Sequence, residues 1–156
     1  MKSSIASRRR QFLIRAVAGL VLCWGYTALS EEQNCTLNVT VEGLRSDKGA
    51  VLLRLYDGAK GFPMKEARAS LGRTVSIEGG VASVEIGGLP PGEYALAVVH
   101  DEDGDGKLLA NWIGMPKEGV GTSNNPKPRF GPPKWKHAKF SVADQSLRVR
   151  IWIRYL

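Results

Sequence analysis

Apolar and polar residues alternate along much of the chain from residue 36 onward, and this period of two is typical of half-buried β-strands. A sustained helical period is not found after the first thirty residues. The alternating or continuously apolar segments are 36–41, 50–56, 74–78, 81–86, 93–100, 138–142 and 147–155. They predict an all-β domain, a seven-stranded antiparallel Greek-key β-sandwich.

Two of these segments also predict a position in the fold. Residues 93–100 are apolar on both faces, which indicates a central strand. Residues 147–155 alternate between aliphatic residues and a row of arginines with Trp152. The aliphatic residues expected to face the core are Leu147, Val149, Ile151 and Ile153. The arginine row can be an anion-binding face or a solvated outer face, and we favour the second because arginine stems cover apolar surface.

The first thirty residues are typical of a cleaved export signal. A basic start is followed by an apolar core at 12–22 and by small residues that end at Ser30. Residues 9–13, Arg-Arg-Gln-Phe-Leu, resemble the twin-arginine export pattern, with the general secretory route as the alternative. The core is shorter than the ~20 residues that span a bilayer, so no membrane span is expected after cleavage. We expect the mature protein in the periplasm or outside the cell.

The mature segment, 31–156, is long enough for a single domain with a buried core. Its charge is segregated, since residues 31–116 hold 8 basic and 13 acidic side chains and residues 117–156 hold 9 and 2. Nucleic acid is not expected as a partner, because its binding needs basic and aromatic residues across one face. Cys35 is the only cysteine after the signal. An internal disulfide is therefore excluded.

Residues 101–136 show little regular patterning, over a length well beyond the ~12–15 residues of ordinary loops. We expect one long loop packed at an end of the sandwich and stiffened by its prolines. The loop contains Trp112, Phe130 and Trp135. These aromatic residues form either the loop's own small core, which we favour, or a platform for a ligand.

An Asp-x-Asp-x-Asp-Gly run follows the strand predicted at 93–100. Alternating carboxylates around a glycine turn can converge on one hard cation such as calcium. The EF-hand pattern also needs a glutamate at its twelfth position, where this chain has Trp112. The run therefore supplies only some of the ligands of such a site. The alternative is that the Asp-Gly pairs only build turns. The candidate calcium ligands are Asp101, Asp103, Asp105 and Asn111, completed by backbone carbonyls, Glu118 or the amides of Asn124 and Asn125.

The same loop supports a second hypothesis, a carbohydrate-binding module. Aromatic ring faces can stack on sugar rings, and side-chain amides can bond to hydroxyl groups. The candidate ligand-binding residues are Trp112, Asn124, Asn125, Arg129 and Trp135. Exposed, coplanar tryptophans would favour a glycan, and buried tryptophans would favour a structural role.

Enzyme activity is not expected, and no residue is predicted to be catalytic. The chain has neither a Gly-x-Ser-x-Gly motif nor a plausible nucleophile–base–acid arrangement. His100 and His137 are the only histidines. Without a third nitrogen or sulfur ligand at a suitable spacing they do not predict a zinc site, and His100 is expected to be structural.

Several motifs resemble an uncharacterised family of exported bacterial proteins that is known only as a domain of unknown function. They are Gly-Leu-Pro-Pro-Gly-Glu-Tyr at 88–94, His-Asp-Glu-Asp-Gly-Asp-Gly-Lys-Leu at 100–108, Asn-Trp-Ile-Gly-Met-Pro-Lys-Glu-Gly at 111–119, Ser-Asn-Asn at 123–125 and Arg-Phe-Gly-Pro-Pro at 129–133. The resemblance covers roughly residues 37–153 and departs at Leu109, where the family pattern has an acidic residue. The Leu-Pro-x-Gly-x-Tyr motif also resembles prealbumin-type and carboxypeptidase-regulatory-type sandwiches. That likeness implies an immunoglobulin- or prealbumin-like fold and brings no activity with it.

The sequence therefore predicts a non-enzymatic, monomeric, exported β-sandwich domain. In the favoured interpretation a calcium-binding loop orders an end that binds a ligand or partner, or only stabilises the domain. The carbohydrate-binding module is the alternative. The expected partner is an envelope or extracellular glycan or protein.

Overall fold

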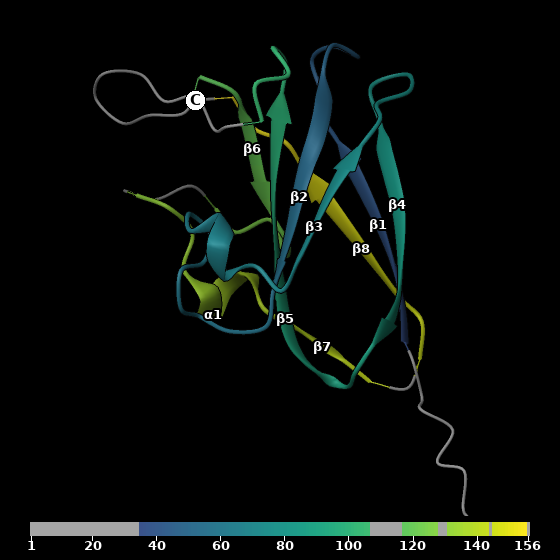
Figure 1. Ribbon diagram of the computed structural model, residues 1–156, viewed down its shortest axis with the longest axis vertical. Helices are drawn as coiled ribbons and strands as arrows, with labels where there is room; N and C mark the ends of the chain where they lie inside the picture. The colour runs from purple at the N-terminus through teal and green to yellow at the C-terminus, as the bar shows by residue number, and fades with distance from the viewer. Residues whose placement is uncertain (1–34, 107–116, 128–130, 144, 156) are drawn as a thin grey trace, which may run out of the picture. The chain divides into compact units, whose positions relative to one another are not determined.

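The computed structural model describes residues 35–106, 117–127, 131–143 and 145–155, so the predicted export signal lies outside the described residues. The described segments form two β-sheets and very little helix (Figure 1). The elements are β1 (Cys35–Glu42), β2 (Ala50–Tyr56), the 3-10 helix η1 (Glu66–Arg68), β3 (Leu71–Val75), β4 (Ala82–Leu89), β5 (Gly92–Asp101), β6 (Gly119–Thr122), α1 (Trp135–Ala138), β7 (Phe140–Val142) and β8 (Leu147–Trp152). No helix among them is long and apolar enough to cross a membrane.

The two sheets pack face to face around one apolar core, which confirms the all-β sandwich. One sheet has the strand order β4-β1-β8, and the other has the order β3-β2-β5-β6 with β7 paired to β5. Side chains from both sheets fill the core, as alternation along each strand requires. Its fully buried members include Leu37, Val39, Leu53, Leu55, Leu96, Val98, Ile151 and Ile153.

The strand count and one pairing direction differ from the predicted seven-stranded antiparallel arrangement. The described residues contain eight strands, and β8 runs parallel to β1, from Leu37 opposite Leu147 to Glu42 opposite Trp152. All other strand pairs are antiparallel. Alternation identifies a strand and its buried face, but it carries no information on direction, so the sequence did not predict the parallel pair.

Strand β5 is central, as its two apolar faces predicted. It pairs with β2 over residues 95–101 and on its other edge with β6 over residues 97–100, while β7 pairs with residues 92–94. Residues 94–98 are all buried. Figure 1 shows α1 beside the lower half of β5, whereas the strand's arrowhead lies at the top. Any site at Asp101 therefore lies at the end of this strand away from α1.

The segment predicted as one long loop, 101–136, contains strand β6 and runs back along β5. Gly119 and Gly121 alternate in β6, so the strand shows no apolar pattern. Both glycines lie where a side chain would not fit, since a Cβ on Gly119 would be 2.4 Å from Ile153 Cγ2 and one on Gly121 would be 2.8 Å from Ile151 Cγ2. A bridge between Val120 and Arg154 joins β6 to the chain just after β8. Within this segment, the described residues 119–122 are thus part of the sandwich.

Candidate functional site

The acidic run forms a tight turn at the end of β5, stabilised by its own first carboxylate. Asp101 is 3% exposed. Its Oδ1 accepts a hydrogen bond from the backbone N–H of Gly104, and its Oδ2 accepts one from Gly106, each at 2.9 Å. Asp103 Oδ1 accepts the N–H of Asp105 at 3.2 Å. Gly104 and Gly106 both have φ of 75°, a conformation that glycine adopts without strain.

This turn brings together the three predicted aspartates. One carboxylate oxygen from each of Asp101, Asp103 and Asp105 lies within 4.8 Å of the others. Calcium binds oxygens at about 2.3–2.6 Å, so two oxygens on one ion can be up to about 5 Å apart. The three oxygens therefore meet the distance requirement for one calcium ion. Among the described residues, no second group of three metal-ligating side chains lies this close together.

The backbone on the other side of the turn fixes its position. A Cβ on Gly49 would lie 1.8 Å from the carbonyl oxygen of Asp101, so only glycine can occupy this position. The ring of His100 is completely buried, and its Nε2 lies 2.8 Å from the carbonyl oxygen of Lys48. The turn at residues 46–49 is thereby held against the end of β5.

His100 is structural, as predicted. Its Nδ1 lies 2.6 Å from the Tyr155 hydroxyl, which also accepts the backbone N–H of Arg45 at 3.0 Å. Because the Lys48 carbonyl can only accept, Nε2 carries a hydrogen and donates it to that carbonyl. Both ring nitrogens are thus engaged within the protein. The other histidine, His137, is exposed on α1, and the two do not form a metal site with other described residues.

A charged pair lies beside the acidic turn. Arg45 forms an ion pair with Glu102, and the Ser46 hydroxyl donates a hydrogen bond to Glu102 at 3.0 Å. The hydrogen bonds from Arg45 hold the pKa of Glu102 below its usual range, with a smaller opposite effect from burial. The Arg45 guanidinium also lies 4.3 Å from the centre of the Tyr155 ring. Glu102 therefore stabilises the end of the sandwich and is not grouped with the three aspartates.

The predicted ligand residues Asn124 and Asn125 have their amides engaged with the backbone. Asn124 Nδ2 donates to the carbonyls of Ala138 and Lys139 at 3.2 and 2.8 Å. Asn125 Nδ2 donates to the Arg150 carbonyl at 2.9 Å, and its Oδ1 accepts the N–H of Trp152 at 2.7 Å. These bonds connect the end of β6 to α1 and to β8. They favour a structural role over the predicted contact with a sugar.

The two asparagines also lie far from the acidic turn. The adjacent Ser123 is completely buried, exchanges hydrogen bonds with the backbone of Leu96, and donates from its hydroxyl to the Ala138 carbonyl. Leu96 precedes Asp101 by five residues, which is about 17 Å along a strand. The described contacts of Asn124 and Asn125 therefore give no support to a role for their amides in the calcium site. Asn111, Trp112 and Arg129 lie outside the described residues.

Trp135 lies beside the first half of β5, away from the acidic turn. It begins α1, which leads into β7, and β7 pairs with the first three residues of β5. Its ring is half-buried and meets the Phe62 ring edge to face, with centroids 5.7 Å apart and an interplanar angle of 82°. A calcium ion in the turn therefore does not share an end of the sandwich with Trp135.

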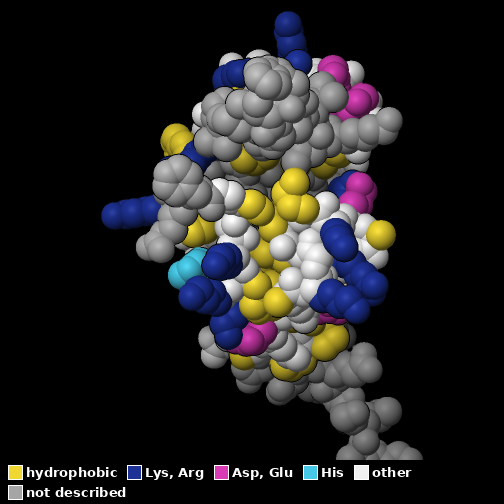
Figure 2. All heavy atoms as spheres, turned by 90° about the vertical axis from the view of Figure 1, so that its left-hand side faces the viewer, with side chains coloured by type: hydrophobic (Ala, Val, Ile, Leu, Met, Phe, Trp, Pro, Cys, Tyr) yellow, Lys and Arg dark blue, Asp and Glu magenta, His cyan; other side chains and the backbone are white. Residues whose placement is uncertain are grey.

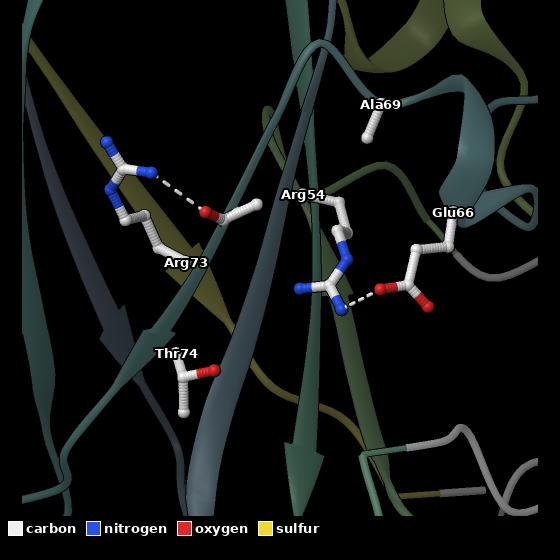
Figure 3. Close-up of a pocket in the computed structure, with 6 residues that line it drawn as sticks. Arg54, Glu66, Ala69, Arg73 and Thr74 are labelled. Carbon is white, nitrogen blue, oxygen red and sulfur yellow. Dashed lines mark hydrogen bonds and ion pairs between the residues drawn. The ribbon is translucent and has the colours of Figure 1, made fainter.

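A separate small pocket of about 360 Å3 lies over the outer face of β2 and β3. Figure 3 shows Arg54 and Glu66 extending toward each other across it, joined by an ion pair, while Arg73 extends in another direction. The Arg54 guanidinium also donates to its neighbouring carbonyl, that of Leu53, at 3.2 Å. Because Arg54 is already paired with Glu66 and Arg73 donates to the Gly72 carbonyl, we assign no ligand to this pocket.

Comparison with known families identifies the chain. The model of the family described as "Uncharacterized protein conserved in bacteria (DUF2141)" matches residues 39–150. The chain belongs to this family. No curated protein and no solved structure gave a match. The resemblance noted in the sequence is thereby confirmed.

In this DUF2141 protein, motifs that carried the resemblance have structural roles. The Ser-Asn-Asn motif joins β6 to α1 and β8. The Leu-Pro-Pro-Gly-Glu-Tyr motif forms the turn into β5, where the Tyr94 hydroxyl donates to the Pro90 carbonyl at 3.0 Å. Sequence reasoning missed the contact between Phe62 and Trp135, because 73 positions separate them and no local pattern connects them.

Proposed function

We propose that this DUF2141 protein is an exported, non-catalytic binding domain whose acidic turn holds a calcium ion. The observation that carries the calcium proposal is the convergence of oxygens from Asp101, Asp103 and Asp105 within 4.8 Å. Three carboxylates this close repel one another, and a divalent cation removes that repulsion. The ion would then fix the turn that closes β5.

The hydrogen bonds within the turn are compatible with a bound ion. Each oxygen of an ionised carboxylate has two lone-pair directions, so Asp101 can accept an N–H and still contact a cation. Backbone carbonyls and water supply the remaining ligands that calcium needs. Magnesium is expected to bind poorly, because it requires near-ideal octahedral geometry at about 2.0–2.1 Å and loses water reluctantly.

Calorimetry and thermal unfolding of the purified exported protein test the site. Extracellular calcium modules bind with Kd values of about 10⁻⁴–10⁻³ M. At a Kd of ~10⁻⁴ M and millimolar calcium the stabilisation is about 1.4 kcal/mol, which corresponds to a Tm increase of roughly 3–8 °C. Magnesium at the same concentration should give little of this shift. Absence of both heat and shift at millimolar calcium would contradict the proposal.

The matched variants are Asp103→Asn and Asp57→Asn. Asp103→Asn retains an oxygen that can accept the Asp105 N–H but removes one charge, so it should abolish the calcium shift without unfolding the protein. Asp57 is an exposed aspartate outside the acidic turn. Asp57→Asn removes the same charge and should leave the shift unchanged. An equal loss in both variants would indicate a nonspecific charge effect.

Export is tested separately. The basic, apolar and small residues of the first thirty positions predict cleavage near Ser30. Protein sequencing of the exported form should begin near Glu31, and a mature soluble form that retains Met1 would contradict export with cleavage. Replacing Arg9 and Arg10 with lysine should block transport by the twin-arginine route. Normal transport of that variant would favour the general secretory route.

The carbohydrate alternative has less support. Asn124 and Asn125 bond to the backbone, and Trp135 is perpendicular to its aromatic neighbour instead of forming a flat platform. Among the described candidates this leaves Trp135 alone for contact with a ligand. Its surroundings favour a different kind of partner.

A further inference from the structure

A groove of about 580 Å3 lies between the segment before η1 and the segment that leads into α1. Its volume is within the ~300–1,000 Å3 range of ligand sites. Figure 2 shows the side of the domain on which α1 lies, where a band of apolar side chains has Lys and Arg side chains on both sides. The apolar residues that line the groove are Ala59, Phe62, Pro132, Pro133 and Trp135.

A chain of aromatic contacts fixes the groove to the core. Tyr56, which is 1% exposed, meets Phe62 edge to face with centroids 5.3 Å apart. Phe62 in turn meets Trp135 at 5.7 Å. The Tyr56 hydroxyl donates to the Pro63 carbonyl at 2.9 Å, which positions the segment carrying Phe62. A ligand would therefore meet a preformed surface, which lowers the entropic cost of binding.

The groove carries positive charge. Lys134 and Lys136 line one wall, and the exposed Lys60 follows Ala59 on the other. Nearby glutamates are already paired, Glu66 with Arg54 and Glu93 with Lys139. The lysines are therefore available to anionic groups of a partner.

We propose that this groove binds a linear acidic peptide segment. One apolar or aromatic side chain of the segment packs into the corner that Phe62 and Trp135 form, and flanking carboxylates pair with Lys134 and Lys136. Tryptophan in a preformed apolar site is the residue type that most often dominates peptide and protein binding. Charge complementarity selects the acidic partner and speeds association.

The geometry favours a peptide over two other anionic partners. A sugar platform presents a flat ring face, whereas Phe62 and Trp135 meet at 82° and form a corner. A bilayer needs apolar side chains that protrude into it, whereas Phe62 and Trp135 line a concave groove. A narrow side chain with acidic neighbours fits both the corner and the lysines.

The proposal rests on the proposed binding role and names its partner, but it does not depend on calcium. Tyr56, which contacts Phe62 of the groove, pairs with Ala95 of β5, and Ala95 precedes Asp101 by six residues, about 20 Å along a strand. Asp103→Asn should therefore bind peptide as the wild type does. If the wild-type protein binds calcium but no peptide, the groove proposal fails and the calcium proposal stands.

The test begins with a phage-displayed library of random peptides, selected on the purified exported protein. Sequences that combine acidic residues with an aromatic or aliphatic anchor should be enriched, and their affinity should fall as salt is raised. No enrichment, or enrichment of basic or uncharged sequences, would overturn the proposal. Binding of alginate or of vesicles containing phosphatidylglycerol in place of the peptides would also overturn it.

Variants then locate the contact. Trp135→Ala should weaken binding of a selected peptide by roughly tenfold or more, and so should the double variant Lys134→Glu/Lys136→Glu. The control for the aromatic change is Trp152→Ala, because Trp152 is 52% exposed and lies on β8, away from the groove. Circular dichroism checks that each variant is folded, and the lysine variant tests the groove even if Trp135→Ala does not fold.

The charge control is Arg148→Glu/Arg150→Glu, on the outer side of β8. It removes as much positive charge as the lysine variant and should leave peptide affinity within about twofold of wild type, since it does not touch the groove. Equal weakening by both charge variants would show that net charge drives binding and would overturn the assignment to the groove.

Discussion

The side chain of Asn125 accepts the backbone N–H of Trp152 at 2.7 Å and donates to the carbonyl of Arg150 at 2.9 Å. A single amide group thus makes the two hydrogen bonds that a neighbouring strand would make to this stretch of β8. The backbone of Asn125 has a positive φ of 44°, which asparagine tolerates better than most residues. The contact fixes β8 at the point where Ile151 enters the core.

The first prediction concerns these two hydrogen bonds. Asn125→Gly removes both while keeping a residue that accepts a positive φ, so it should lower the free energy of unfolding by about 1–3 kcal/mol. Asn125→Ala should cost more, because alanine adds backbone strain to the same loss. Denaturant unfolding measures both variants. A glycine variant as stable as wild type would show that the amide contributes nothing to stability.

The contact between Gly119 and Ile153 supplies the second prediction. Gly119→Ala places a methyl carbon 2.4 Å from Ile153 Cγ2, which is much closer than two carbon atoms can approach without strain. The resulting overpacking should lower the free energy of unfolding by about 1–3 kcal/mol.

The matched control for that variant is Gly87→Ala. Gly87 also lies within a strand, β4, but nothing lies within 4 Å of an added Cβ. Alanine there should be neutral or slightly stabilising, by up to about 1 kcal/mol, because it restricts the unfolded chain. If both alanine variants unfold at the same denaturant concentration as wild type, β6 does not pack against β8 as described.

The sequence predicted those features of the fold that depend on residues close together in the chain. Alternation identified the inward-facing residues of 147–153, because Ile151 and Ile153 are 0% and 2% exposed and Leu147 and Val149 are partly buried against the core. Strand β6 was missed because its glycines have no side chains to form a pattern, and they are explained only by contact with β8. The same limit applies to the direction of β8, which depends on a partner strand more than one hundred residues away.

The candidate site was likewise predicted only where it depends on residues close together in the chain. The convergence of the three aspartates could be predicted because all three lie within five consecutive residues, 101–105. Asn124 and Asn125 were assigned to a ligand because nothing local shows that backbone groups 14–27 residues away occupy their amides. The groove was missed for a similar reason, since Phe62 and Trp135 meet only after the chain has folded.

The third prediction tests the register of β8. Ile151→Ala removes a side chain with no exposed surface and should lower the free energy of unfolding by about 2–5 kcal/mol. Arg150→Ala, one position earlier, removes a side chain that is 75% exposed and should cost less than about 0.5 kcal/mol. Urea unfolding of the two variants under identical conditions measures the difference. Comparable losses would mean that the strand does not alternate between core and solvent.

The last prediction follows from the ion pair between Arg45 and Glu102. The pKa of Glu102 in the folded protein is lowered from its ordinary value of 4.5, chiefly by hydrogen bonds from Arg45. A carboxyl whose pKa is lower in the folded state than in the unfolded state stabilises the fold when it is ionised. This contribution is fully present above the ordinary pKa and is lost as the pH falls through the lowered folded-state value.

Stability should therefore decline on acidification below about pH 4.5 more steeply in the wild type than in Glu102→Gln, which cannot titrate. Arg45→Ala should reduce the pH dependence in the same way, because it removes the cause of the lowered pKa while leaving the carboxyl in place. The double variant should add little to either single change, since both disrupt one interaction. Urea unfolding at about pH 6 and about pH 3 measures the difference. If both single variants keep the full wild-type dependence, other carboxylates control acid stability, and the pair beside the acidic turn contributes nothing to it.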